Sequence, residues 1–119
     1  METVLWNQDE QMVEIIAGST HLLLHPNLEF EAAWSTARRI VTDRGYRMPS
    51  MLHLAIIHRL KDPINGLILA HNGATIKDSW YWSREKVDLS HAMYYDMADD
   101  FIGYDLQRYT NYVRAIREL

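Results

Sequence analysis

Acidic residues and one histidine in the last third of the chain have the types and spacing that catalysis would need. Asp99 and Asp100 are adjacent, and neighbouring carboxylates can bind a hard cation or supply a base whose pKa the twin shifts. With His91 and Asp96 they form the best candidate for a catalytic set. Residues 98–103, however, are typical of a turn between strands, where aspartates accept hydrogen bonds from local backbone amides. A hydrolase that uses His91, Asp99 and Asp100 is therefore the last of three functions that we consider.

Six histidines raise the question of a metal site. His53 and His58 are five residues apart, so a helix would not present them together as it does residues four apart. His21 and His25 would share one face of a strand, but a zinc site needs a third ligand, and no acid stands at a suitable spacing. The chain has no cysteine, which excludes disulfides, thiolate ligands and a cysteine nucleophile. We therefore expect no metal and no cofactor. The chain also has no glycine-rich phosphate loop and no serine in a nucleophile-elbow pattern, so we do not expect an enzyme.

Tyrosines near the C-terminus indicate recognition instead of catalysis. Several of them fall in the last 26 residues, beside asparagine, aspartate and glutamine. Rigid aromatic side chains with adaptable polar neighbours are typical of binding surfaces. The alternative is that half of these tyrosines belong to the core of a sheet, as we expect for Tyr95. The ligand-binding residues that we predict are Tyr94, Asp96, Asp99, Asp100, Tyr104 and Tyr109.

Charge is unevenly distributed along the chain. Residues 78–105 hold seven acidic and two basic residues, whereas the formal charge of the whole chain is −4. Such a segment repels phosphate, so we expect no nucleic-acid ligand. It is either an ordinary solvated face or a surface that docks a basic partner or mimics nucleic acid.

Length and composition predict one globular domain over residues 1–119. The chain has 119 residues, of which 48% are hydrophobic and 24% charged, and a chain of this size buries about 65% of its unfolded surface. No apolar run approaches the roughly 18 residues of a membrane span. The first ten residues carry acids where a secretory signal carries positive charge. We therefore expect a cytoplasmic or virion-associated protein, or a surface protein if the chain is a fragment of a longer one.

The first half of the chain predicts a hairpin followed by two helices. Residues 12–17 and 21–24 are β-rich on either side of a turn, and Pro26 is expected to end the second strand. Helical periodicity then begins at Leu28 and ends at Gly45. Ser50 is predicted to cap a second, largely buried helix that Pro63 ends. Since His53 stands where a capping box has glutamate, we expect no reciprocal cap.

The second half predicts strands, so the fold class is α+β. Residues 67–70 are either a strand or a helical segment, and the strands are expected at 79–83, 92–97, 102–106 and 112–116. Alternation in the second of these places Met93, Tyr95 and Met97 inward. Tyr94 and Asp96 are then expected to face outward.

Four motifs follow one another in an order that is typical of one family. They are Gly45-Tyr46-Arg47-Met48-Pro49-Ser50, Tyr81-Trp82-Ser83, Ala92-Met93-Tyr94-Tyr95-Asp96-Met97 and Tyr112-Val113-Arg114-Ala115-Ile116-Arg117. Over residues 22–117 the chain resembles the bacterial C-type-lectin-like domains, which include the C-terminal domain of collagen-like Legionella adhesins. More distant relatives in that group are the formylglycine-generating enzymes and the variable proteins of diversity-generating retroelements. The resemblance implies a C-type-lectin-like fold with an N-terminal hairpin, two helices and a C-terminal antiparallel sheet.

The motif residues are expected to be chiefly structural. Trp82 should be a core aromatic whose N–H needs a partner, and Arg114 and Arg117 should pair with acids or pack at the sheet edge. Arg47 should hold backbone carbonyls or a carboxylate. Trp82 is followed by serine and arginine instead of the asparagine-aspartate pair of the calcium lectins, so we expect calcium-independent binding.

Three functions follow. The first is a non-enzymatic recognition domain that binds a protein or a glycan through its C-terminal sheet and loops. The second is a small intracellular or phage-encoded inhibitor or assembly subunit that acts by protein–protein contact. The third is the hydrolase. Whether the chain forms a homo-oligomer stays open.

Overall fold

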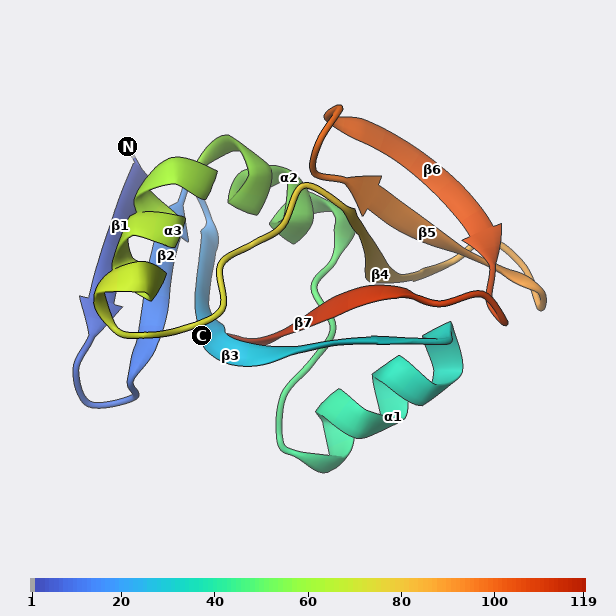
Figure 1. Cartoon of the computed structure of the whole chain (residues 1–119), viewed down its shortest axis with the longest axis horizontal. Coiled ribbons are helices and arrows are strands. Elements are labelled where there is room, and N and C mark those ends of the chain that lie inside the picture. The colour runs from blue at the N-terminus through green and yellow to red at the C-terminus, as the bar shows by residue number, and fades with distance from the viewer. Residues whose placement is uncertain (1) are drawn as a thin grey trace.

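A computed structural model of the chain describes residues 2–119, which form three helices and seven strands (Figure 1). The fold class is α+β, as predicted. In chain order the elements are β1 (Glu2–Asn7), β2 (Met12–Ala17), β3 (Thr20–Ala32), α1 (Trp34–Asp43), α2 (Met51–Arg59), α3 (Lys61–Ala70), β4 (Trp80–Lys86), β5 (His91–Asp96), β6 (Phe101–Leu106) and β7 (Asn111–Glu118).

All the described strands belong to one mixed sheet with the order β1-β2-β3-β7-β4-β5-β6. The last strand, β7, lies in the middle, antiparallel to β3 and parallel to β4 through the pair Tyr81–Tyr112. The predicted layout is therefore only partly correct. Three strands, not a hairpin, come before the helices, and a third helix follows the two predicted ones.

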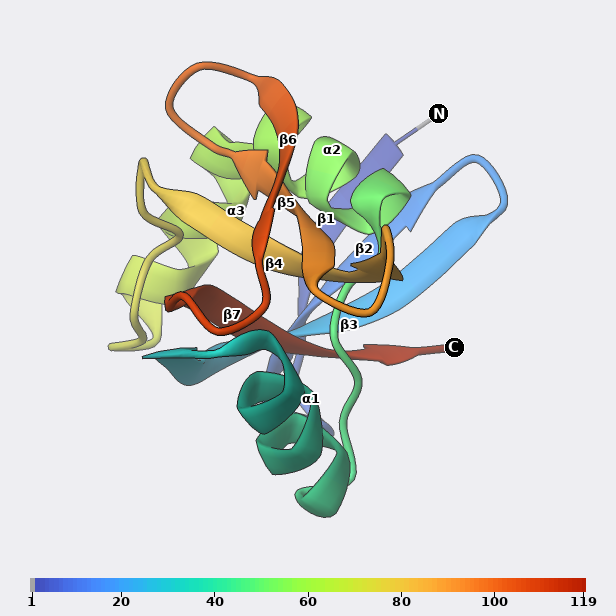
Figure 2. The ribbon, with the colours of Figure 1, turned by 90° about the vertical axis from the view of Figure 1, so that its right-hand side faces the viewer.

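Both faces of the sheet are covered, and each cover forms a hydrophobic core. On one face α2 and α3 pack through residues such as Leu54 and Ile64. On the other face α1 packs through Trp34, Ala37 and Val41, and Figure 2 shows this helix below the sheet, away from the other two. Strands in the centre of the sheet are consequently buried on both sides. In the part of the chain described, no helix has the length and hydrophobicity to cross a membrane.

Strand β3 is longer than predicted, and α1 is shorter. The strand continues through Pro26 to Ala32, and the first helix starts at Trp34 instead of Leu28. The pairing of β3 with β7 is interrupted between Leu24 and Glu29, so Pro26 needs no N–H for the ladder. The helical pattern that we saw from Leu28 is therefore correct only from Trp34 onward.

A capping box forms at the start of α2, although we predicted none. Ser50 Oγ accepts a hydrogen bond from the His53 backbone N–H at 3.1 Å, and His53 Nδ1 accepts one from the Ser50 N–H at 3.0 Å. A neutral imidazole nitrogen thus replaces the usual carboxylate oxygen. Burial, together with the nearby guanidinium of Arg84, lowers the pKa of His53 and favours this neutral form.

The predicted end of the second helix is also corrected. Instead of ending the helical region, Pro63 lies in the first turn of α3, where the missing N–H has no partner to lose. Residues 67–70, which the sequence left undecided, complete α3.

Candidate functional site

The six residues predicted to bind a ligand divide into an exposed and a buried group. Tyr104 is 65% exposed and Tyr109 49%, and Asp99 and Asp100 are also exposed. In contrast, Tyr94 is 6% exposed and Asp96 7%. The prediction that Tyr94 and Asp96 face solvent is therefore wrong.

The predicted alternation of side chains along β5 is correct, but the conclusion that Tyr94 faces solvent is not. Tyr95 and Met97 lie in the core beneath α2 and α3, and Tyr94 points to the opposite face. That face is covered as well, because Tyr94 belongs to the core that α1 closes. The exposed ring of Trp80 stacks on Tyr94 with centroids 4.2 Å apart. The alternation of side chains along one strand cannot show that a helix, here α1, covers the second face of the sheet.

Asp96 has a local structural role. Its Oδ1 accepts hydrogen bonds from the backbone N–H groups of Ala98 at 2.9 Å and Asp99 at 3.3 Å. These bonds hold the turn between β5 and β6. The Asp96 carboxylate therefore stabilises the turn and does not face a ligand. The turn that we predicted over residues 98–103 is correct only up to Asp100, because β6 begins at Phe101.

The predicted catalytic set is not brought together. His91 begins β5 and Asp99–Asp100 follow its end, so a strand of about 17 Å separates them, at roughly 3.3 Å per residue. His91 instead contacts Asp88, with Nδ1 2.9 Å from the carboxylate. Asp100 accepts a hydrogen bond from the Tyr95 hydroxyl and lies 3.4 Å from His58 Nδ1. Burial and the Asp100 carboxylate raise the pKa of Tyr95 to about 12.

Large side chains are exposed on β6, which is an edge strand of the sheet. Ile102 and Tyr104 lie on the face to which Tyr95 points, and Phe101 lies on the opposite face. We call these three residues the β6 surface. Phe101 is 55% exposed and Ile102 52%, although both are large hydrophobic residues. Of these three residues, only Tyr104 is predicted from the sequence to bind a ligand. Phe101 and Ile102 follow the pattern of an ordinary strand, and only the strand order shows that β6 is an edge.

Acidic side chains border the β6 surface. Asp99 and Asp100 are exposed in the turn before the strand, and Asp105 is half-buried near its end. Asp105 accepts a hydrogen bond from the Leu106 N–H at 2.9 Å. The border therefore presents negative charge to a ligand that approaches β6.

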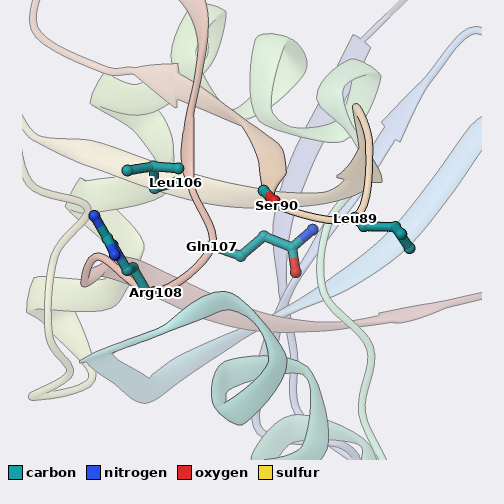
Figure 3. Close-up of a pocket in the computed structure, with 5 residues that line it drawn as sticks. All are labelled: Leu89, Ser90, Leu106, Gln107 and Arg108. Carbon is teal, nitrogen blue, oxygen red and sulfur yellow. The ribbon is translucent and has the colours of Figure 1, made fainter.

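A hollow of about 320 Å³ lies at the far end of β6 from Asp99 and Asp100, and Figure 3 draws its lining. Gln107 lies at its centre and holds the surrounding loops, since its Nε2 donates to the backbone oxygens of Asp88 at 3.0 Å and His91 at 3.1 Å. The hollow is open and adjoins Tyr109, whose ring Arg108 overlies at 5.5 Å. Its lining residues are Leu89, Ser90, Leu106, Gln107 and Arg108.

A buried ion pair joins the central strands of the sheet. Arg114 donates from Nη2 to Glu29 Oε1 at 3.0 Å, and both side chains are almost completely buried. Arg114 also donates from Nη1 to the His25 carbonyl at 2.8 Å, and the Tyr81 hydroxyl donates to Glu29 at 2.6 Å. The network joins β3, β7 and β4, and the expected pairing of Arg114 with an acid is confirmed.

The structural roles expected of Trp82, Arg117 and Arg47 are also confirmed. Trp82 is fully buried, and its Nε1 donates to the Ala32 carbonyl at 2.9 Å. Arg117 lies 3.2 Å from Glu10, and Arg47 lies 3.9 Å from the Glu118 carboxylate. These residues are part of the scaffold.

Neither a metal-binding cluster in the described part of the chain nor a related protein was found that would assign a role to the β6 surface. No group of three or more histidine, aspartate or glutamate side chains within residues 2–119 is arranged to hold a metal ion. No protein-family model matches the chain, and comparison with curated proteins finds no match.

Proposed function

We propose that the chain is a non-enzymatic recognition domain that binds another protein through the β6 surface. The observation that carries the proposal is the exposure of three large side chains on one edge strand, with Ile102 and Tyr104 on one face of β6 and Phe101 on the other. Large apolar side chains grouped on a surface mark interaction sites, and aromatic side chains contribute most of the energy of such interfaces.

Neighbouring residues extend this surface. Trp80 is 41% exposed and lies on the same face of the sheet as Phe101, since Trp80 pairs with Asp96 and Asp96 pairs with Phe101. Tyr109 continues the aromatic character past the end of β6. An apolar centre with a polar border is the usual composition of a protein interface.

The C-type-lectin-like assignment belongs to this proposal. Its support is the order of elements, because the helices lie between the N-terminal strands and the strands of the C-terminal half. The buried positions of Trp82 and Arg114 agree with the structural roles that the motifs imply. In such a domain the C-terminal sheet and its loops are the part that binds a ligand.

A protein fits the surface better than a glycan does. Sugar recognition needs convergent polar groups that fix the orientation of hydroxyls, whereas Phe101 and Ile102 offer only apolar contact. Glycans nevertheless form the second arm of the test, because the family resemblance includes them.

The experiment compares capture by the intact chain and by surface variants. The tagged protein is incubated with extract of the source cells, and bound proteins are quantified by mass spectrometry. Tyr104→Ser should reduce capture of the specific partner at least about tenfold, as loss of an interface anchor does. Leu69→Ser is the matched control, since Leu69 is equally exposed at 65% but lies on α3.

Two results would contradict the proposal. One is a partner captured equally by the intact chain and by Tyr104→Ser. The other is binding to a glycan array, with loss on Tyr104→Ser, in the absence of any protein partner.

A further inference from the structure

The hydrogen-bonding direction of β6 follows from its register with β5. The two strands pair antiparallel from His91–Leu106 to Asp96–Phe101, and Gln107 N donates to Ser90 O at 2.7 Å in the same register. Hydrogen-bonded and non-hydrogen-bonded pairs alternate in an antiparallel ladder. Gly103 and Asp105 therefore bond to β5, and the backbone groups of Ile102, Tyr104 and Leu106 point away from it.

Two of these three outward residues keep their backbone groups available. Leu106 N donates to Asp105, and Leu106 O accepts from Tyr109 N at 3.0 Å. The N–H and C=O groups of Ile102 and Tyr104 have no partner within residues 2–119. Two donors and two acceptors thus lie in a row beside two exposed apolar side chains.

Aspartate is the only usual protection of an edge strand that β6 carries, in the form of Asp105. Proteins shield such edges with charged side chains, above all lysine, or with proline or a bulge. The six residues of β6 include no lysine and no proline, and their register with β5 is continuous. At the other edge of the sheet, Glu2 of β1 forms an ion pair with Arg59 of α2 and α3 packs against the strand.

Charge indicates what would pair with this edge. Residues 96–105 contain four aspartates and no lysine or arginine. A second copy of β6 would bring further carboxylates to the same edge, which is unfavourable between like charges. A strand that carries lysine or arginine would place positive charge near Asp99, Asp100 and Asp105.

From these observations, and resting on the proposed function, we propose that β6 binds an extended, basic segment of the partner protein as an additional strand of the sheet. Backbone bonds to Ile102 and Tyr104 would supply affinity without sequence preference, as in strand addition generally. The side chains of these two residues and the bordering aspartates would supply selectivity.

The first test selects ligands without assuming a sequence. A display library of random 12-residue peptides is panned on the immobilised full chain. We expect enriched peptides that alternate apolar residues with lysine or arginine. Asp99→Asn combined with Asp105→Asn should weaken the best peptide at least about fivefold in low salt, and less in high salt.

The second test detects strand addition at single residues. In the free protein the amides of Ile102 and Tyr104 should exchange with solvent much faster than those of Gly103 and Asp105. Binding of the best peptide should slow the exchange of Ile102 and Tyr104 at least about tenfold. N-methylation of alternate peptide bonds in that peptide should abolish binding.

A matched pair of variants separates the backbone from the side chain. Tyr104→Ala and Tyr104→Pro both remove the ring, but only proline removes the outward N–H. Tyr104→Pro should bind the peptide at least about tenfold more weakly than Tyr104→Ala. Slow exchange of the Gly103 amide in both variants establishes that the β5–β6 ladder is intact.

The outcomes distinguish this inference from the proposed function. A peptide that needs the Tyr104 ring but tolerates N-methylation would overturn strand addition and leave the recognition surface standing. If panning enriches acidic peptides, or enriches no peptide, the proposal that the bound segment is basic is overturned. A dimer in sedimentation equilibrium that Tyr104→Pro dissociates would assign the edge to a second copy and also overturn it.

Discussion

The ring of Tyr94 lies against Gly103 on the neighbouring strand. A Cβ at Gly103 would be 2.5 Å from the Tyr94 hydroxyl oxygen and 2.6 Å from the ring carbon that bears it. Trp80 covers the other side of the ring, with the two ring planes within 10° of parallel. The missing side chain of Gly103 is therefore what allows Tyr94 to be buried next to an edge strand.

Gly103→Ala should displace the Tyr94 ring and destabilise the protein by about 1–3 kcal/mol, as overpacking does. Urea denaturation measures this change. Gly66→Ala is the control, because nothing lies within 4 Å of a Cβ at Gly66 in α3. That variant should gain up to about 1 kcal/mol, since alanine is the better helix former. Equal stability of the intact chain and Gly103→Ala would show that the ring moves at no cost.

Arg114→Met should destabilise the protein by about 3–5 kcal/mol, because it leaves the Glu29 carboxylate buried without its partner. Replacing both residues, by Arg114→Met and Glu29→Leu, should recover part of the loss. Denaturant titration of Arg114→Met, of Glu29→Leu and of the double variant forms a double-mutant cycle with the intact chain. A single Arg114→Met variant with less than about 1 kcal/mol of loss would contradict the role of the ion pair.

Acid should weaken the capping box of α2. The pKa of His53 is lowered in the folded protein, so the unfolded chain binds the proton more tightly. The contribution of neutral His53 is complete above the unfolded pKa of about 6.5 and is lost as the pH falls through the folded pKa.

The test measures the free energy of unfolding at pH 7.5 and pH 5, conditions on either side of about 6.5. His53→Gln, whose side-chain oxygen accepts without titrating, should lose less stability on acidification than the intact chain. The pKa of His25 is also lowered, by burial and by Arg114, so part of the acid sensitivity should remain. An identical pH dependence in both proteins would exclude His53 as a source.

Trp82→Ala and Trp80→Ala should distinguish the two tryptophans of β4, which lie on the same face of the strand on either side of Tyr81. Trp82 is fully buried, so its loss should cost about 3–5 kcal/mol. Trp80 is partly exposed and contacts Tyr94, so its loss should cost about 1 kcal/mol. Thermal melts of both variants check the order, and the reverse order would place Trp82 at the surface.

Elements with local signals could be predicted from the sequence. The hairpin between β2 and β3, the Ser50 cap and the end of α1 before Gly45 all depend on residues within a few positions of one another. Gly45 has a φ of +85°, which glycine adopts without the strain that a Cβ causes. Burial of Trp82 and Arg114 also followed from residue type and motif.

Long-range pairing decided what the local pattern could not. Strand β3 continues past Pro26 because β7, about 85 residues later in the chain, supplies its hydrogen bonds. Tyr94 is buried because α1 and Trp80 cover a face that alternation alone assigned to solvent. Phe101 and Ile102 are exposed because β6 lies at the edge of the sheet. A sequence specifies which side chains share a face, but the order of strands and the layers packed on them determine whether that face meets another core or water.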